Sequence, residues 1–410
     1  MRVGFAWGGA EGEAFRDVLR SFSRVTGATV EPVVLPANEE QQLSSLSRSQ
    51  QLDVALVSAP GIMRRLQQAN DLVPIEDAET RTEIARGYDP IWRDAASVGG
   101  RPYGVLFKAT EKSLMWYRTD LLARTGIVTP DLPASWSALV ADARKLAQAG
   151  VPPVVIGSAA SAGPGGNGWT LTDWFENVYL SVAGPNLYDR LARHELPWTD
   201  ATVVSALATL ADIWGDQRLV NVGMAPPGSM TYLDSLARFG GSPGVGLYYE
   251  GDFVLTDLGH GGPVAATIGT FPFPPAGALH GGVVVGGDMA VEMRAGRAAT
   301  LLLRYLASPE AAAAWIGPTG NFLVSPNRLA PSRQDRRTAI VDVGSAPVVR
   351  FDMSDLAPPD FGAGSEWRDL NGFLRDLQAD PAMVASIVQH YASVLETDAT
   401  AAYEALPGAG

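Results

Sequence analysis

The sequence predicts a two-lobed α/β protein, and two observations support this fold class. Short apolar strands alternate with amphipathic helices from the N-terminus onward, which is typical of a parallel sheet with helices on both faces. Three charged, Pro-rich or Gly-rich breaks then separate β-rich segments, and such breaks are where a chain passes from one lobe to another. The 410 residues are enough for two or three ordinary domains.

The clearest break lies within residues 101–122. Two extended apolar runs, 103–107 and 114–117, are joined by a short charged stretch. That stretch holds Lys108 and Lys112, two of the three lysines in the chain, whereas the other 28 of the 31 basic residues are arginine (31 − 3 = 28). Lysine is a compact point charge and arginine a planar fork. This placement therefore suggests either a chosen chemistry at the first crossing or a chance occurrence of two lysines in a solvated loop.

The first lobe is expected to begin with three strand–helix pairs. Phe15, Val18, Leu19 and Phe22 follow helical spacing, and Gly27 is a helix stop. The expected strands are 3–7, 29–35 and 53–57, and the expected helices are 11–24, 39–49 and 62–69. Ligands of parallel sheets bind at the carboxyl ends of the strands, which here are residues 7–9 and 58–60.

After the first crossing, helical and extended patterns continue to the C-terminus. Ser135 is the expected N-cap of the first of these helices, and a capping box is expected at 308–311. The expected helices are 135–148, a helix running from the Trp169 region through Tyr179, 201–214, 297–306 and 381–395. The expected strands are 153–157, 245–249 and 283–285, and residues 286–288 directly follow the last of these strands. The expected loops are 158–168 and 238–246.

The breaks define the lobe boundaries. The Pro-rich segment 270–275 is extended and suits a second crossing, and a third is expected to start at Gly317. Crossings near 108–112, 271–275 and 317–321 give a first lobe of residues 1–109 and 275–317. The second lobe then consists of residues 112–272 and 320–410.

Charge and composition exclude several kinds of protein. The net charge is −13, from 31 basic and 44 acidic residues, which argues against nucleic-acid binding because that needs a positive surface. The chain has no cysteine, so disulfides, thiolate metal sites and a thiol nucleophile are absent. No apolar stretch is long enough to span a membrane, and the first residues are expected to form a strand rather than a signal peptide.

Several ordered motifs resemble the extracellular solute-binding proteins of carbohydrate ABC importers, the group that includes maltose-binding protein, and they are most similar to its α-glucoside-binding branch. The motifs are Phe107-Lys108, Lys112-Ser113-Leu114, Trp116-Tyr117, Thr172-Asp173-Trp174, Phe351-Asp352, Ser354-Asp355-Leu356, Gly362-Ala363-Gly364 and Trp367.

This resemblance covers nearly the whole chain and has definite implications. It implies the type II periplasmic-binding-protein fold, in which two α/β lobes joined by three crossovers close on a sugar like a hinge. It further implies a monomer without catalytic activity, cofactor or metal, which delivers its sugar to membrane permease subunits. The implied location is extracytoplasmic, either periplasmic or anchored as a lipoprotein, with the signal segment absent from this sequence.

Sugar chemistry indicates which residues bind the ligand. Aromatic rings cover the apolar C–H faces of a hexose, and charged or amide groups bind its hydroxyls through strong hydrogen bonds. Residues of these types follow the expected strands or lie at the crossing. The candidate ligand-binding residues are Trp7, Glu11, Gln42, Lys108, Glu111, Trp169, Asp173, Trp174, Glu250, Phe253, Asp288 and Trp367.

Other aromatic residues are expected in the core. Trp116, Trp136, Trp214 and Trp315 lie in apolar patterns, and of Trp169 and Trp174 at least one is expected to stack on sugar. The family often has an acidic or amide residue where this chain has Ala59-Pro60, and a tryptophan in place of Phe253. These departures leave open which sugar is bound: maltose, sucrose, trehalose and glucosylated small polyols all suit the set.

Two other functions remain open at this stage. The first is a glycoside hydrolase with paired carboxylates, for which Asp173, Glu250 and Asp288 are available. However, the sequence has no eight-fold β/α recurrence and no HExxH, GxSxG or P-loop motif. The second is a binding lobe for an amino acid or polyamine. The abundance of tryptophan favours a sugar ligand over either of these. The sequence therefore predicts a sugar-binding protein that is not an enzyme.

Overall fold

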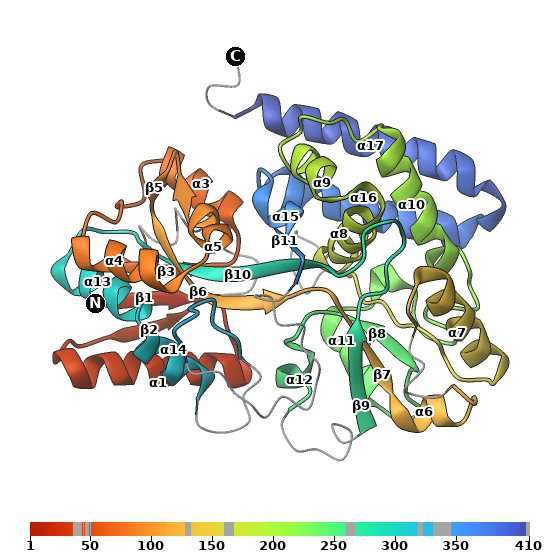
Figure 1. The fold of residues 1–410 in the computed structure, drawn as a ribbon, viewed down its shortest axis with the longest axis horizontal. Coiled ribbons are helices and arrows are strands. Elements are labelled where there is room, and N and C mark those ends of the chain that lie inside the picture. The colour runs from red at the N-terminus through yellow and green to blue at the C-terminus, as the bar shows by residue number, and fades with distance from the viewer. Residues whose placement is uncertain are drawn as a thin grey trace. The chain divides into compact units, whose positions relative to one another are not determined.

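The chain is divided between two units, whose helices and strands are labelled in Figure 1. The structure is a computed structural model, and it describes residues 1–35, 43, 45, 49, 51–127, 133–159, 168–259, 267–317, 323–330 and 346–406. The first lobe comprises Met1–Thr110, Leu255–His260 and Gly286–Asp335. The second lobe comprises Glu111–Val254, Gly261–Val285 and Arg336–Gly410.

The sheet of the first lobe is centred on β1 (Arg2–Phe5). This strand runs parallel to β2 (Glu31–Val34) on one side and to β3 (Val54–Val57) on the other. Next to β3 lies the C-terminal part of β10 (Gly282–Glu292), which runs antiparallel and pairs Met289 with Val57. β6 (Gly104–Glu111) pairs with β10. The expected parallel order thus holds for β1, β2 and β3, whereas β10 makes the sheet mixed.

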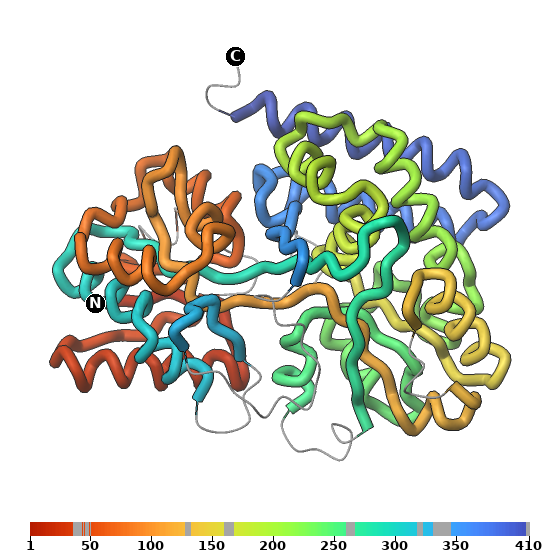
Figure 2. Tube along the Cα trace, in the orientation of Figure 1, coloured from red at the N-terminus to blue at the C-terminus, as the bar shows by residue number. Residues whose placement is uncertain are grey.

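Helices from widely separated parts of the sequence pack around this sheet. Figure 2 shows the teal helix α14 (Pro309–Ile316) returning beside the red helix α1 (Gly9–Thr26). Helix α13 (Arg297–Leu306) packs on α4 (Ala78–Gly87), where Arg304 pairs with Asp77. In the part of this lobe that the structure describes, the chain also forms α3 (Pro60–Gln68), α5 (Pro90–Ala95), β4 (Ser97–Val98) and β5 (Arg101–Pro102).

The second lobe contains a small antiparallel sheet and many helices. β7 (Leu114–Arg118) lies between β8 (Leu247–Tyr249) and β9 (Ile268–Pro272), and β11 (Val348–Phe351) runs parallel to the first residues of β10. The helices are α6 (Thr119–Ala123), α7 (Trp136–Gln148), α8 (Trp169–Ala183), α9 (Pro185–Ala192), α10 (Ala201–Trp214), η3 (Pro227–Ser229), α11 (Tyr232–Gly240), α15 (Met353–Leu356), η5 (Phe361–Glu366), α16 (Trp367–Ala379), η6 (Pro381–Met383) and α17 (Val384–Glu404). A short helix, α12 (Val254–Asp257), starts in this lobe and continues into residues of the first.

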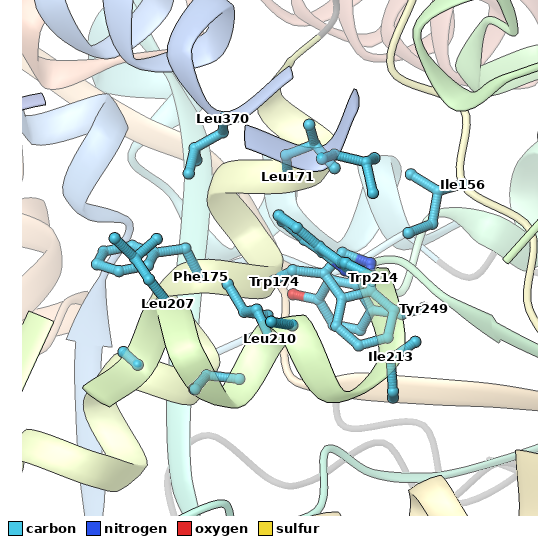
Figure 3. Packing of buried hydrophobic residues seen from close by; sticks show 14 of the residues in the cluster. Ile156, Leu171, Trp174, Phe175, Leu207, Leu210, Ile213, Trp214, Tyr249 and Leu370 are labelled. Atoms are coloured by element: carbon cyan, nitrogen blue, oxygen red, sulfur yellow. The ribbon is translucent and has the colours of Figure 1, made fainter. Parts of the chain in front are cut away.

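An aromatic core holds the second lobe together. Trp174 from α8 lies 4.7 Å from Tyr249 and 6.4 Å from Trp214, measured between ring centroids. Figure 3 shows these rings surrounded by aliphatic side chains such as Leu171 and Ile213. Burial of each such side chain contributes about 1.5–3 kcal/mol. Trp116, Trp136, Trp214 and Trp315 are all buried, which confirms their expected place in the core.

The lobe boundaries differ from those expected in three places: at the second crossing, at the third crossing, and at Leu255–His260, which belong to the first lobe instead of the second. The Pro-rich segment near 271–275 is not a crossing, because β9 pairs with β7 and the Phe273 N–H donates to the Ser113 carbonyl. The chain instead changes lobe within β10, between Val285 and Gly286. Residues 318–322, where the third crossing was expected, lie outside the described residues. Residues 323–330 belong to the first lobe, with Val324 bridging Ala109.

The expected helix caps, strands and loops were confirmed only in part. Ser135 caps α7, because its hydroxyl accepts a hydrogen bond from the Ala138 N–H at 3.3 Å. Ser308 caps α14 in the same way, but an alanine stands where a capping box needs a glutamate or glutamine, so only half of that box forms. Residues 153–157 make only isolated bridges at Val154 instead of a strand. The expected loop at 238–246 begins inside α11.

Two further expectations concern segments that the structure covers in part. The helix expected at 39–49 and the loop expected at 158–168 lie largely outside the described residues. The helix expected at 381–395 is longer than predicted, since α17 extends to Glu404. Among the helices that the structure describes, none has the length and apolar character needed to cross a bilayer.

Candidate functional site

Four of the residues singled out in the sequence converge in the first lobe. The Lys108 ammonium lies 2.9 Å from Glu11 Oε1 and 3.7 Å from Asp288 Oδ2. The same ammonium lies 5.7 Å from the centre of the Trp7 ring, and the Trp7 Nε1–H donates to Asp288 Oδ1 at 3.3 Å. We call these four side chains the Lys108 cluster. It combines an aromatic ring, one cation and two carboxylates in hydrogen-bonding range.

Backbone geometry brings the Lys108 cluster together. Trp7 follows β1, and the turn after it includes Gly9, whose φ of 51° favours glycine. Glu11 then lies in the first turn of α1, where the helix dipole stabilises a negative charge. Lys108 and Asp288 come from β6 and β10. A Cβ atom at Gly287 would stand 2.3 Å from the Lys108 carbonyl oxygen, so the close approach of the two strands requires glycine there.

The Trp7 ring packs against other aromatic rings. It packs edge-on against Phe15 at 5.0 Å and lies 5.1 Å from Trp315, while Trp315 lies 5.3 Å from Phe107. Trp7 as a whole residue is 8% exposed, and the charged side chains of the cluster are 13–14% exposed. The ring is therefore held rigidly, and the polar groups around it are only partly withdrawn from solvent.

The second lobe contributes an aromatic cluster of its own. Trp169 lies 5.2 Å from Tyr232 and 5.7 Å from Phe253, and Tyr232 lies 5.7 Å from Phe253. Trp169 and Phe253 are partly exposed, whereas Tyr232 is buried behind them. We call these three rings the Trp169 cluster. Tyr232 was not predicted from the sequence, because nothing in its neighbourhood separates it from an ordinary buried tyrosine.

Trp367 lies next to the residue that precedes Trp169. A Cβ atom at Gly168 would stand 2.4 Å from the Trp367 Cβ atom, so the absence of a side chain at Gly168 allows the two segments to touch. Trp367 is partly buried, and no residue that the structure describes accepts a hydrogen bond from its buried Nε1–H. The contact at Gly168 therefore helps to fix the position of Trp169 relative to Trp367.

Two predicted carboxylates, Glu111 and Glu250, lie buried beside Asp252. The Glu111 N–H donates to Asp252 Oδ2 at 3.2 Å, and the Asp252 N–H donates to the Glu111 carbonyl at 3.0 Å. The Glu250 carbonyl accepts a hydrogen bond from Trp116 Nε1–H at 2.8 Å. Their main chains are therefore held in place, and a ligand contact by either side chain stays a prediction.

Two other candidates have structural roles, which corrects the sequence-based expectation. Trp174 is 1% exposed in the core of the second lobe, since five residues of helix turn it away from the face that carries Trp169. Asp173 is fully buried, and its Oδ1 lies 3.2 Å from the Lys112 ammonium. Gln42 lies outside the described residues. Across the described part of the chain, no three His, Asp or Glu side chains are arranged to hold a metal ion.

Comparison with known proteins yields matches along most of the chain. The family profile described as bacterial extracellular solute-binding protein matches residues 6–313. The osmoprotective compounds-binding protein GgtB of Synechocystis sp. is 30% identical over 334 residues, covering 78% of this chain and 76% of that protein. The alpha-glucosides-binding periplasmic protein AglE of Rhizobium meliloti is 26% identical over 386 residues, covering 90% of this chain and 82% of that protein.

Solved structures share the fold at lower sequence identity. The bacterial solute receptor AcbH, described as having an exclusive preference for β-D-galactopyranose, matches with a TM-score of 0.83 and 18% identity over 98% of this chain and 99% of that chain. The GacH receptor of Streptomyces glaucescens matches with a TM-score of 0.69 and 15% identity over 97% of this chain and 98% of that chain. At these identities the likeness concerns the fold alone.

Proposed function

The chain belongs to the bacterial extracellular solute-binding proteins, and from that membership we propose that it captures an α-glucoside and delivers it to the permease of an ABC importer. The two-lobed periplasmic-binding-protein fold expected from the sequence is confirmed. Members of this family act outside the cytoplasmic membrane and are binding proteins rather than enzymes. Anchoring of this chain as a lipoprotein and a monomeric state remain predictions.

The Lys108 cluster is the observation that carries the proposal. A hexose presents apolar C–H faces and a rim of hydroxyl groups, and the indole of Trp7 beside one ammonium and two carboxylates matches both. The ammonium donates and the carboxylates accept, so hydroxyls can bond to either kind of group with charge-assisted strength. The partly exposed rings of the Trp169 cluster offer a second apolar platform.

The relatives support a particular class of sugar. One binds osmoprotective compounds and another binds alpha-glucosides, according to their names. Osmoprotectants are small, highly soluble and mostly neutral molecules, so a glucoside of a small polyol satisfies both descriptions. We therefore propose an α-glucoside of this size, either a disaccharide or a glucosylated polyol.

The arrangement of carboxylates favours binding over hydrolysis. A glycosidase needs one carboxyl group that keeps a proton to give to the leaving group. Glu11 and Asp288 both lie within ion-pair distance of the same Lys108 ammonium, so the Lys108 cluster holds two carboxylates paired with one cation and no separate acid–base pair. Asp173 belongs to a buried ion-pair cluster and is fully enclosed. We infer that the protein binds its sugar without turnover.

A thermal-shift panel tests the proposed ligand. The panel compares maltose, sucrose, trehalose and glucosylglycerol with matched β-glucosides, galactosides, amino acids and polyamines. A ligand at 100 times its Kd stabilises the folded state by about 2.7 kcal/mol, so the α-glucosides should raise Tm by several degrees. Stabilisation by amino acids or polyamines alone would overturn the sugar assignment.

Prolonged incubation tests the absence of turnover. The best α-glucoside is incubated with the protein, and free glucose is measured against a buffer control. We expect the two rates to be equal. Glucose release above the buffer rate, proportional to protein concentration, would support the glycoside hydrolase alternative instead.

A further inference from the structure

The second lobe contains a buried ionic cluster around Lys112. The Lys112 ammonium donates a hydrogen bond to Asp352 Oδ2, and it lies 3.2 Å from Asp173 Oδ1 and 3.8 Å from Asp355 Oδ2. The Lys112 side chain is 12% exposed, and those of Asp173 and Asp352 are almost entirely enclosed. One ammonium group is therefore shared by three carboxylates, one from α8 and two from the α15 segment.

More carboxyl groups surround Lys112 than one ammonium could neutralise if all of them were ionised. Glu176 from α8 and Glu366 from η5 are fully buried near the same carboxylates. Burial acts to raise the pKa of Asp352, yet Lys112 and hydrogen bonds from Ser354 and Asp355 lower it to about 2. Burial, together with the neighbouring charge of Asp352, raises the pKa of Asp173. The charge balance of this region thus depends on Lys112.

The main chain of Lys112 is fixed as firmly as its side chain. Its carbonyl oxygen accepts hydrogen bonds from Asn177 Nδ2 at 2.9 Å and from the Tyr249 hydroxyl at 2.6 Å. Its N–H donates to the Val284 carbonyl at 2.9 Å. The ammonium is therefore presented from a rigid position, and the helices that carry the carboxylates are oriented around it.

These carboxylates belong to the segments that carry Trp169 and Trp367. Asp173 lies one helical turn after Trp169 in α8. Asp352 is the N-cap of α15 and accepts a hydrogen bond from the Asp355 N–H at 2.8 Å; η5 follows α15 and ends directly before Trp367.

A second carboxylate links the same two segments. Glu176 from α8 accepts hydrogen bonds from the N–H groups of Met353 at 2.7 Å and Ser354 at 2.9 Å. The first turn of α15 is thus held by α8 as well as by its own cap. Since Glu176 is itself buried among carboxylates, this contact too depends on the balance of charge in the cluster.

We propose that Lys112 is a positioning residue for ligand binding, whose ammonium holds α8 and the α15–η5 segment so that the segments carrying Trp169 and Trp367 meet at Gly168. Its effect on affinity rests on the proposed function, whereas its effect on the order of α15 and η5 does not. Nothing in the sugar chemistry of the site requires Lys112 to touch the ligand.

The proposal has a pH signature that simple packing would lack. Without the ammonium, the carboxylates repel one another, and protonation relieves the repulsion; a variant lacking Lys112 should therefore regain order as pH falls. The titratable groups that face this region are Asp173, Glu176, Tyr188, Tyr249, Asp352, Asp355, Glu366 and Asp369. The carboxyl groups among these would take up the protons, because the tyrosines are already neutral.

The experiment compares Lys112→Met with the charge-balanced double variant Lys112→Met/Asp352→Asn. Asparagine retains an oxygen that can cap α15, so the double variant restores balance without removing the cap. Lys145→Met is the matched control, because Lys145 also pairs with one aspartate but is 58% exposed on α7. Amide hydrogen exchange over residues 353–367 and affinity for the best α-glucoside are measured at pH 5.5 and 7.5.

The expected pattern is specific. At pH 7.5, Lys112→Met should show exchange at least tenfold faster over residues 353–367 and affinity at least tenfold weaker than the unmodified protein. Both defects should shrink at pH 5.5 and in the double variant, while Lys145→Met behaves like the unmodified protein. Unchanged exchange in Lys112→Met at both pH values, or defects that are equal at both and persist in the double variant, would overturn the proposal.

Two further outcomes are also decisive. If Lys112→Met does not fold at pH 7.5, Lys112→Arg and Asp352→Asn replace it; the proposal then requires near-normal exchange in Lys112→Arg, and accelerated exchange there overturns it. If the unmodified protein binds no sugar at all, the proposed function fails, and the exchange measurements still decide whether Lys112 orders these segments.

Discussion

Gly168 lies against the backbone of Trp367, so closely that a Cβ atom on Gly168 would stand 2.7 Å from the Trp367 Cα atom. Real Cβ atoms are not found this close to another backbone atom, so any larger residue must push the two segments apart. Because Trp169 follows Gly168 directly, this contact fixes the spacing of two aromatic residues proposed to bind the ligand.

Replacing this glycine should therefore weaken binding. Gly168→Ala is expected to reduce affinity for the best α-glucoside about tenfold or more and to destabilise the protein by about 1–3 kcal/mol, as overpacking usually does. Gly228→Ala is the matched control, because its nearest neighbour is Asn371 Oδ1 at an ordinary 3.7 Å. Isothermal titration calorimetry and thermal melts provide both readouts. Equal behaviour of the two variants would show that the contact can relax.

Trp367 and Trp174 should respond differently to truncation. Trp367→Ala removes a partly exposed platform, so affinity should fall about thirtyfold or more while the ligand-free Tm changes little. Trp174→Ala opens a cavity in the aromatic core and should cost about 3–5 kcal/mol of stability. If Trp367→Ala instead lowers the ligand-free Tm by many degrees while its folded fraction binds normally, Trp367 is a core residue.

Lys108 should matter for affinity through its hydrogen bonds. Lys108→Met keeps most of the aliphatic volume but removes the donor and leaves Glu11 and Asp288 without their shared ammonium. Charge-assisted hydrogen bonds contribute about 1.5–3 kcal/mol, so affinity should fall by about one to two orders of magnitude. Calorimetry against Lys145→Met separates this loss from a general effect of lysine removal. Binding within twofold of the unmodified protein would place the ligand elsewhere.

Glu366 should make stability fall as pH rises. The side chain is fully buried, and among the described residues neither of its carboxyl oxygens has a hydrogen-bond partner. Burial and then the charge of Asp352 raise its pKa, so the folded state retains a proton that the unfolded chain has already released. The resulting stabilisation is present at low pH and is lost as pH rises above the ordinary value for glutamate.

Glu366→Gln tests this pH dependence. The neutral amide removes the cost of ionisation, so the variant should be more stable than the unmodified protein at pH 8 by about 1–3 kcal/mol. The difference should diminish toward pH 4.5. Thermal melts across this range give the comparison, and Glu310→Gln, an exposed position on α14, provides the control. A variant that is destabilised at pH 8 would show that the carboxylate is charged and satisfied.

Ligand binding should also make the protein smaller in solution. The family's hinge-like mode of binding predicts that saturating α-glucoside reduces the radius of gyration measured by small-angle X-ray scattering. The unmodified protein without sugar gives the baseline. An unchanged radius in the unmodified protein would contradict closure without contradicting binding itself.

Local patterns predicted much of the secondary structure. Helices α10 and α13 were predicted with their observed bounds, since apolar spacing and flanking polar residues agree there. Residues 153–157 were misassigned because their apolar run suits either a strand or a buried extended segment, and only long-range pairing decides between them. The shift of the second crossing into β10 has the same cause, because proline content does not reveal which strand β9 pairs with.

The candidate site was predicted residue by residue but not as an arrangement. Trp7, Glu11, Lys108 and Asp288 were each chosen for chemistry at the ends of expected strands, yet their convergence depends on the approach of β6 to β10. Asp288 even proved to lie within β10 rather than after it. Asp173 and Trp174 were misassigned because α8 is buried on nearly every face, so helical periodicity does not separate core from site.

The ion pairs of Lys112 could not be predicted from the neighbouring sequence. Its partners Asp173 and Asp352 are 61 and 240 residues away in the sequence. The scarcity of lysine drew attention to the position, and the ion pairs came only with the fold.

Because the three lysines are buried to different extents, they should differ in their reactivity toward amine-reactive reagents. Lys108 and Lys112 are 13% and 12% exposed and engaged with carboxylates, whereas Lys145 is 58% exposed on α7. An acylating dye at neutral pH should therefore modify Lys145 in preference to the other two lysines and leave the Lys108 cluster intact. With no cysteine in the chain, an introduced thiol would accept a thiol-reactive dye at a single chosen position, independently of the lysines.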